Sequence, residues 1–78
     1  MELTLSGISQ DAKEATITIW HNRQGDNVSR GEDLLEVVTD KATFDVPCPC
    51  NGVLGSIKRR AGETVRTDEV VAVILEQE

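Results

Sequence analysis

An internal repeat limits the folds open to this chain more than any other feature. When the sequence is shifted by 37 residues, residues 14–38 align with residues 51–75 without a gap. Gly25 then falls on Gly62, and the acid that follows each glycine, Asp26 or Glu63, coincides as well. Apolar positions also coincide, and the pairs are Ile17 with Leu54, Trp20 with Ile57, Leu34 with Val71, and Val37 with Ile74. Matching glycines, acids and apolar positions indicate duplication of one structural unit.

Short strand-like segments dominate each unit. Residues 15–20 alternate, which predicts Ile17 and Ile19 on one face, and residues 43–46 place Phe44 and Val46 together. Residues 34–39, 52–57 and 70–75 also have strand character, and residues 3–5 are expected to add an edge strand. No segment has an apolar stripe of helical period. The pattern predicts an all-β sandwich or barrel in which two strand-turn-strand units pack with approximate two-fold symmetry.

Length and charge exclude several classes of protein. The 78 residues predict one domain, 1–78, and the net charge of −6 argues against nucleic acid as a partner. The one basic run, residues 58–60, is most simply a solvated face. The chain has no signal-peptide pattern, and its longest apolar run, residues 70–75, is too short to cross a membrane. Cys48 and Cys50 are too close together for a disulfide framework, which predicts a reduced, intracellular protein.

Residues 39–42 join the two repeat units and have strand-like residues on both sides. Asp40 and Lys41 are therefore expected at the tip of a tight two-residue hairpin, a turn in which both central residues favour φ > 0. A lysine in the left-handed region costs roughly 1–2 kcal/mol. Local departures from sequence rules often mark functional sites. Taken alone, however, a lysine in a surface turn is most often only a soluble side chain.

The motifs around this turn change that interpretation. From about residue 14 to residue 75 the chain resembles the lipoyl domain of the biotinyl/lipoyl attachment family. The matching segments are Gly25-Asp26-Asn27-Val28, Leu34-Leu35-Glu36-Val37, Thr39-Asp40-Lys41-Ala42-Thr43, Val46-Pro47-Cys48-Pro49, Gly52-Val53-Leu54 and Ala61-Gly62-Glu63-Thr64-Val65. The Asp-Lys-Ala turn at the centre of a duplicated unit is the specific part of the likeness.

The resemblance implies a flattened barrel-sandwich of two four-stranded sheets with a hairpin at residues 39–43. It implies that lipoic acid is amide-linked to Lys41, and that Thr39, Asp40 and Ala42 contribute to partner recognition. Residues 6–13 match a loop that influences which decarboxylase is recognised. The implied role is that of a carrier, non-catalytic in itself, within a dihydrolipoyl acyltransferase. Its arm would be reductively acylated, deliver the acyl group to coenzyme A and be reoxidised.

The partners implied by the resemblance are a lipoate ligase or octanoyl/lipoyl transferase, a thiamine-dependent 2-oxo acid decarboxylase, the acyltransferase core and dihydrolipoyl dehydrogenase. The domain itself is expected to be a monomer in the cytoplasm, or in the mitochondrial matrix of a eukaryote. The chain departs from the family pattern at Val38, where an acid is usual, and in residues 5–8, which lack the usual proline. These departures leave the identity of the 2-oxo acid open.

Two alternatives stay open on the sequence. A biotin carboxyl carrier domain shares the architecture, but its lysine has methionine on both sides, whereas Lys41 has Asp40 and Ala42. An unmodified barrel-sandwich interaction module would need no particular lysine at this turn. No catalytic or metal site is expected: His21 is the only histidine, and Cys48 and Cys50 supply two ligands where zinc normally takes four.

Overall fold

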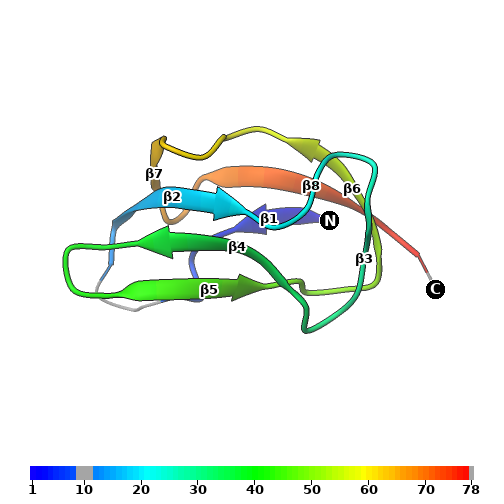
Figure 1. Ribbon diagram of the computed structural model, residues 1–78, viewed down its shortest axis with the longest axis horizontal. Coiled ribbons are helices and arrows are strands. Elements are labelled where there is room, and N and C mark those ends of the chain that lie inside the picture. Colours follow the sequence, from blue (N-terminus) through cyan, green and yellow to red (C-terminus); the bar gives the residue numbers. More distant parts are fainter. Residues whose placement is uncertain (9–11, 78) are drawn as a thin grey trace.

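The computed structural model describes residues 1–8 and 12–77. Within them the chain forms eight strands and no helix. The strands are β1 (Glu2–Thr4), β2 (Glu14–Trp20), β3 (Asn27–Val28), β4 (Asp33–Val38), β5 (Thr43–Pro47), β6 (Gly52–Ile57), β7 (Thr64–Arg66) and β8 (Val70–Glu76). They build two four-stranded antiparallel sheets, with the orders β1-β8-β6-β3 and β5-β4-β2-β7 (Figure 1). The predicted all-β sandwich is confirmed, including the edge strand near the N-terminus.

The two sheets correspond strand for strand, which confirms the expected two-fold pseudosymmetry. The 37-residue shift relates β2 to β6, β3 to β7 and β4 to β8, and each of these strands occupies the matching place in its sheet. Hydrogen bonds between the halves follow the same relation: the Gly25 amide donates to the Leu54 carbonyl at 2.7 Å, and the Gly62 amide donates to the Ile17 carbonyl at 2.6 Å. Each half therefore holds the turn of the other.

The turns that contain Gly25 and Gly62 adopt the conformation expected of them. Both glycines have φ of +94°, a region that residues with a Cβ rarely enter. The acid after each glycine, Asp26 or Glu63, accepts a hydrogen bond from the backbone amide three residues earlier. Glycine and acid together close the turn, which explains why both recur in the repeat.

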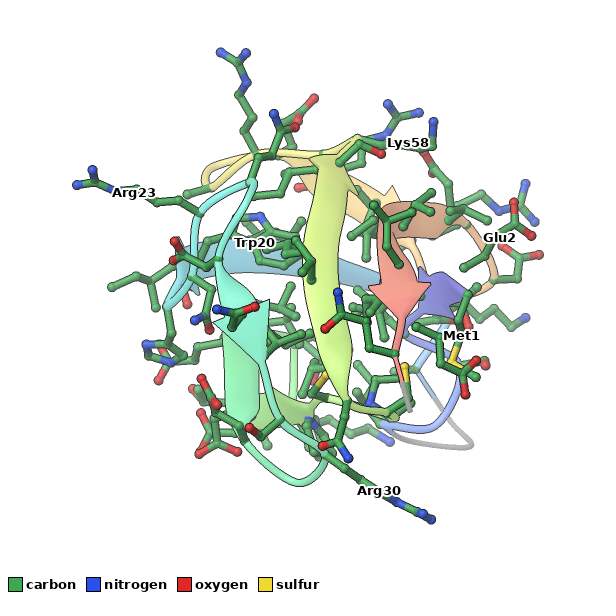
Figure 2. The ribbon with its side chains drawn as sticks, turned by 90° about the vertical axis from the view of Figure 1, so that its right-hand side faces the viewer. Met1, Glu2, Trp20, Arg23, Arg30 and Lys58 are labelled. Atoms are coloured by element: carbon green, nitrogen blue, oxygen red, sulfur yellow. The ribbon has the colours of Figure 1, made fainter. Side chains whose placement is uncertain are left out.

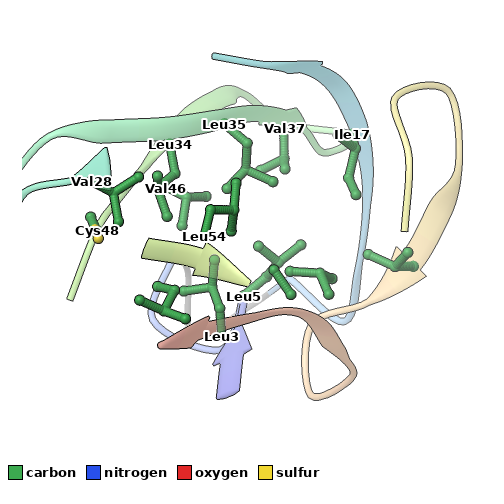
Figure 3. Close-up of a cluster of buried hydrophobic side chains, with 14 of the residues drawn as sticks. Leu3, Leu5, Ile17, Val28, Leu34, Leu35, Val37, Val46, Cys48 and Leu54 are labelled. Carbon is green, nitrogen blue, oxygen red and sulfur yellow. The ribbon is translucent and has the colours of Figure 1, made fainter. Parts of the chain in front are cut away.

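The core lies between the sheets and is entirely apolar in the described residues. Leu34, Leu35 and Val37 of β4 face Leu54 of β6, and all four side chains are fully buried (Figure 3). Burying a side chain of this size contributes roughly 1.5–3 kcal/mol relative to leaving it exposed. Phe44 packs against the buried cluster on the same side of β5 as Val46, as the alternation predicts.

The prediction that Ile17 and Ile19 share a face is wrong. A β-bulge between them shifts the register of β2 against β4, so Ile17 is buried while Ile19 is 46% exposed. The bulge turns Trp20 inward, where its ring packs against the core and its Nε1 donates to the Arg59 carbonyl at 2.9 Å. The same bulge recurs between Leu54 and Ser56 in β6, 37 residues later.

The molecule is elongated, with extents of 35 × 21 × 17 Å. The β4–β5 hairpin forms one end of the long axis, and the marked chain ends lie away from it (Figure 1). In the described residues there is no helix with the length and apolarity that crossing a bilayer requires. The hairpin therefore projects from one end of the molecule, and β4, its first strand, is paired with both β2 and β5.

Candidate functional site

The hairpin between β4 and β5 carries the lysine singled out by the sequence. Val38 and Thr43 form the last cross-strand pair, and residues 39–42 make the connection. The Lys41 side chain is exposed, and within the described part of the chain its amine takes part in no hydrogen bond or ion pair. An amine in this position is open to an enzyme that must approach it from solvent.

Thr39 holds the backbone of the turn. Its amide donates to the Ala42 carbonyl at 2.8 Å, which closes the hairpin. Its hydroxyl accepts from the amides of Lys41 and Ala42, both at 3.2 Å, and also lies 3.2 Å from the Ala42 carbonyl. Short hydroxyl side chains commonly bond the backbone two or three residues ahead in this way. One half-buried side chain thereby fixes the residue that bears the amine.

The expected left-handed conformation at this turn is wrong. No residue other than glycine has positive φ in the described chain, so Lys41 stores no backbone strain. The physical reason lies in the Thr39 hydroxyl. It accepts hydrogen bonds from the Lys41 and Ala42 amides, so these amides do not need a backbone carbonyl as acceptor. The motif resemblance assigns Thr39 to partner recognition only and gives no indication that its hydroxyl holds the turn. A threonine two residues before a turn lysine was the available signal.

The other two predicted recognition residues flank the lysine on the surface. Asp40 and Ala42 are both exposed, and the Asp40 carboxylate forms no ion pair in the described residues. The structure therefore brings Thr39, Asp40 and Ala42 together around Lys41. In the loop expected to influence partner choice, residues 9–11 lie outside the described residues, while Lys13 lines a groove beside the hairpin.

The two cysteines lie in the core, away from this hairpin. Cys48 and Cys50 are free and buried, and the Cys48 thiol donates to the Cys50 carbonyl at 2.9 Å. Burial raises the pKa of the Cys50 thiol, and the nearby Glu76 carboxylate and Cys48 raise it further. The described residues contain no group of three or more His, Cys, Asp or Glu side chains suited to a metal ion. The two thiols act as small core side chains.

The basic run at residues 58–60 belongs to the turn after β6. Arg59 pairs with Glu69, and its exposed neighbours Lys58 and Arg60 project from the surface. Figure 2 shows Lys58 and Arg23 directed away from the sheets on this side of the molecule. The run lies on a different part of the chain from the hairpin and adds nothing to the site.

Comparison with known proteins assigns the family. A family model named Biotin_lipoyl, described as "Biotin-requiring enzyme", matches residues 1–74. The chain belongs to this biotin/lipoyl family. The match extends over nearly the whole chain and includes both sheets and the hairpin. Within the family, an exposed hairpin lysine with a free amine fits a prosthetic group attached through an amide bond.

Individual relatives match nearly the full length of this chain but are much longer. The dihydrolipoyllysine-residue succinyltransferase component of the 2-oxoglutarate dehydrogenase complex of Rickettsia conorii is 37% identical over 76 residues, which make up 97% of this chain and 19% of the relative. The same component of Cupriavidus necator is 36% identical over 74 residues, or 95% and 18%. The chain spans about a fifth of the length of these curated relatives.

A solved structure shows the same fold. The solution structure of the lipoyl domain of the 2-oxoglutarate dehydrogenase complex from Azotobacter vinelandii superposes with a TM-score of 0.80 at 24% sequence identity. The superposition covers 100% of this chain and 99% of that chain. The two structures therefore share one barrel-sandwich fold.

Proposed function

We propose that this chain is a lipoyl carrier domain and that Lys41 is its attachment site. The observation that carries the proposal is the free, exposed amine of Lys41 at the tip of a hairpin whose backbone Thr39 fixes. Asp40 and Ala42 on either side of the lysine favour lipoate over biotin, whose carriers have methionine at both positions. When bound, a lipoyl group supplies a dithiolane that opens on reductive acylation and closes on oxidation.

The chain's own residues supply position and reach. The hairpin holds the Lys41 backbone at one end of the long axis, while the side chain beyond Cβ is free to move. A lysine extended by a lipoyl chain reaches on the order of 14 Å, at about 1.2 Å per bond. Tethering keeps such an arm at roughly millimolar effective concentration at each partner's active site. Recognition falls to Thr39, Asp40 and Ala42, which surround the attachment point.

The relatives favour one complex. The longer proteins that match this chain are named as succinyltransferase components of the 2-oxoglutarate dehydrogenase complex. By that likeness, the partners are a thiamine-dependent 2-oxoglutarate decarboxylase, a succinyltransferase core and dihydrolipoyl dehydrogenase. A lipoate ligase or octanoyl/lipoyl transferase would load Lys41 in the cytoplasm or the mitochondrial matrix.

Intact-mass measurement tests the prosthetic group. The protein is incubated in parallel with lipoate ligase and with biotin ligase, each with its acid and ATP. The proposal expects a mass gain of one lipoyl group with the first enzyme and none with the second. A biotinyl gain would favour a biotin carrier, and no gain in either reaction would favour an unmodified interaction module.

Reductive acylation tests the partner. Lipoylated protein is offered to 2-oxoglutarate, pyruvate and branched-chain decarboxylases, each with its own substrate, and the acylated fraction is followed by mass. The proposal expects fast acylation with the 2-oxoglutarate enzyme alone. Equal or faster acylation by either other decarboxylase would assign the domain to a different complex.

A further inference from the structure

A groove lies beside the hairpin on the outer face of the β5-β4-β2-β7 sheet. It has a volume of about 530 Å³, within the range of roughly 300–1,000 Å³ found for small-molecule sites. The end of β4 contributes Val38, the hairpin contributes Thr39 and Asp40, β2 contributes Thr16, and β7 contributes Thr64. Its rim therefore includes the two residues that immediately precede Lys41.

Three of the residues that line the groove, Val38, Thr16 and Thr64, belong to a row of uncharged, β-branched residues that crosses the whole sheet. Thr43 on β5 pairs with Val38 on β4, Val38 pairs with Thr16 on β2, and Thr16 pairs with Thr64 on β7. The Thr16 and Thr64 hydroxyls bond each other at 2.9 Å. One of these hydroxyls donates to the other, and each residue of the row also carries a methyl group on its Cβ. We call these four residues the methyl row.

Charged residues bound the methyl row on both sides. Farther from the hairpin, Glu36 pairs with Asp45 across β4 and β5, and the Thr18 hydroxyl donates to the Glu36 carboxylate at 2.8 Å. Toward the hairpin end, Asp40, Glu14 and Lys13 line the groove. An apolar group on this face of the sheet would therefore be confined to the methyl row.

The methyl row is within reach of the Lys41 arm. Neighbouring strands lie about 4.8 Å apart, so the path from β4 across β2 to β7 is roughly 10 Å. An arm on the order of 14 Å that folds back from the hairpin covers this path. The tether also makes weak binding sufficient, since at roughly millimolar effective concentration a site with a Kd of about 1 mM is about half occupied.

We infer that the methyl row is a resting site for the apolar chain and dithiolane carried on Lys41. This inference rests on the proposed function, because it requires the lipoyl group. In the resting position, the Lys41 arm contacts Val38 and Thr16 in addition to the hairpin. The carrier then alternates between an arm laid on the sheet and an arm extended toward a partner.

Methyl NMR of the lipoylated full chain tests this inference. We expect shifted Val38, Thr16 and Thr64 methyl signals relative to the unmodified protein, and cross-relaxation between the Val38 methyls and the arm's methylenes. Val38→Glu should abolish the shifts that lipoylation causes in the Thr16 and Thr64 methyl signals, while leaving the lipoyl mass gain intact. The matched control is Leu75→Glu, the repeat-related position on the other sheet, 58% exposed, which should change neither effect.

The possible failures are distinguishable. One negative result would overturn the resting site alone. In it, the lipoyl mass gain is normal, the methyl signals of the methyl row do not shift, and the signals of the arm are as sharp as those of free lipoyllysine. Persistence of the Thr16 and Thr64 methyl shifts in lipoylated Val38→Glu, with its fold verified by its amide spectrum, would do the same. Absence of the mass gain in the wild-type protein would overturn the proposed function and the resting site with it.

Discussion

A single hydroxyl organises the hairpin that presents Lys41. The Thr39 side chain satisfies the amides of Lys41 and Ala42, so neither residue needs the left-handed conformation. The same turn without that hydroxyl would leave two amides to solvent and would relax toward several conformations. Lys41, the proposed attachment site, would then occupy several positions relative to the enzyme that loads it.

Thr39→Ala should therefore weaken both fold and modification. We expect a loss of about 1 kcal/mol in the free energy of unfolding, the usual contribution of such hydrogen bonds, measured by urea titration. The rate of lipoylation by ligase, followed by mass, should fall as well. Thr39→Ser keeps the hydroxyl and should restore both values, whereas equal losses in the two variants would show that the hydroxyl is not responsible.

The Cys50 thiol makes the free energy of unfolding depend on pH. Burial raises the pKa of its thiol, so the folded state favours the protonated form more than the unfolded state does. The resulting stability is complete below the ordinary thiol pKa and is lost as the pH rises through the raised value. Between about pH 7 and pH 10, Cys50→Ala should lose less unfolding free energy than the wild type. Parallel pH profiles would contradict the burial of this thiol.

At the scale of elements, the turn glycines lock each half of the sandwich to the other. Gly62 has φ of +94° and its amide bonds to Ile17, yet a Cβ at this position would meet no atom within 4 Å. Any penalty for a side chain there is therefore one of backbone conformation. At Gly52, in contrast, an added Cβ would collide with the Leu75 carbonyl on the neighbouring strand.

Alanine substitutions separate these two requirements. Gly62→Ala should cost roughly 1–2 kcal/mol from the left-handed backbone alone. Gly52→Ala should cost more, because β6 and β8 must move apart. Gly7→Ala is the control, since Gly7 has negative φ and open space around its Cα, and it should change the unfolding free energy little. Thermal unfolding followed by circular dichroism ranks the three, and a cost for Gly7→Ala equal to that for Gly62→Ala would contradict the backbone argument.

How far the sequence predicts these elements depends on their length and their register. The six longer or terminal strands follow from alternation and apolar runs, but β3 and β7 have two and three residues, too few to show any period. The bulge that exposes Ile19 leaves no local signal, because the sequence alternates without interruption through Ile19. Motif resemblance alone points to Lys41 as the proposed attachment site, whereas the methyl row requires the cross-strand pairing of Val38 with Thr16, which only the structure supplies.

The whole molecule is two copies of one unit that share a single apolar core. Neither sheet buries its inner face alone, so a lesion in one half should destabilise both. Leu54 is fully buried between the sheets, while Leu75, one strand away, is 58% exposed. The hairpin that bears Lys41 belongs to the half opposite Leu54, which allows this coupling to be tested at the functional end.

Leu54→Ala should cost about 2–5 kcal/mol of unfolding free energy, a large share of the stability of a domain this small. Unfolding should stay cooperative, with amide signals of the Lys41 hairpin lost at the same urea concentration as those of β6. Leu75→Ala should be nearly neutral. A hairpin that persisted after β6 had unfolded would show that the two halves fold independently.

Peptide mapping by tandem mass spectrometry of protein loaded by lipoate ligase identifies the side chain that carries the lipoyl group. The chain has three lysines, Lys13, Lys41 and Lys58, so the fragment ions distinguish every candidate amine. The account predicts one lipoyl group per chain, on Lys41 alone, and no loading of Lys41→Arg. Lipoyl on Lys13 or Lys58, or continued loading of Lys41→Arg, would contradict it.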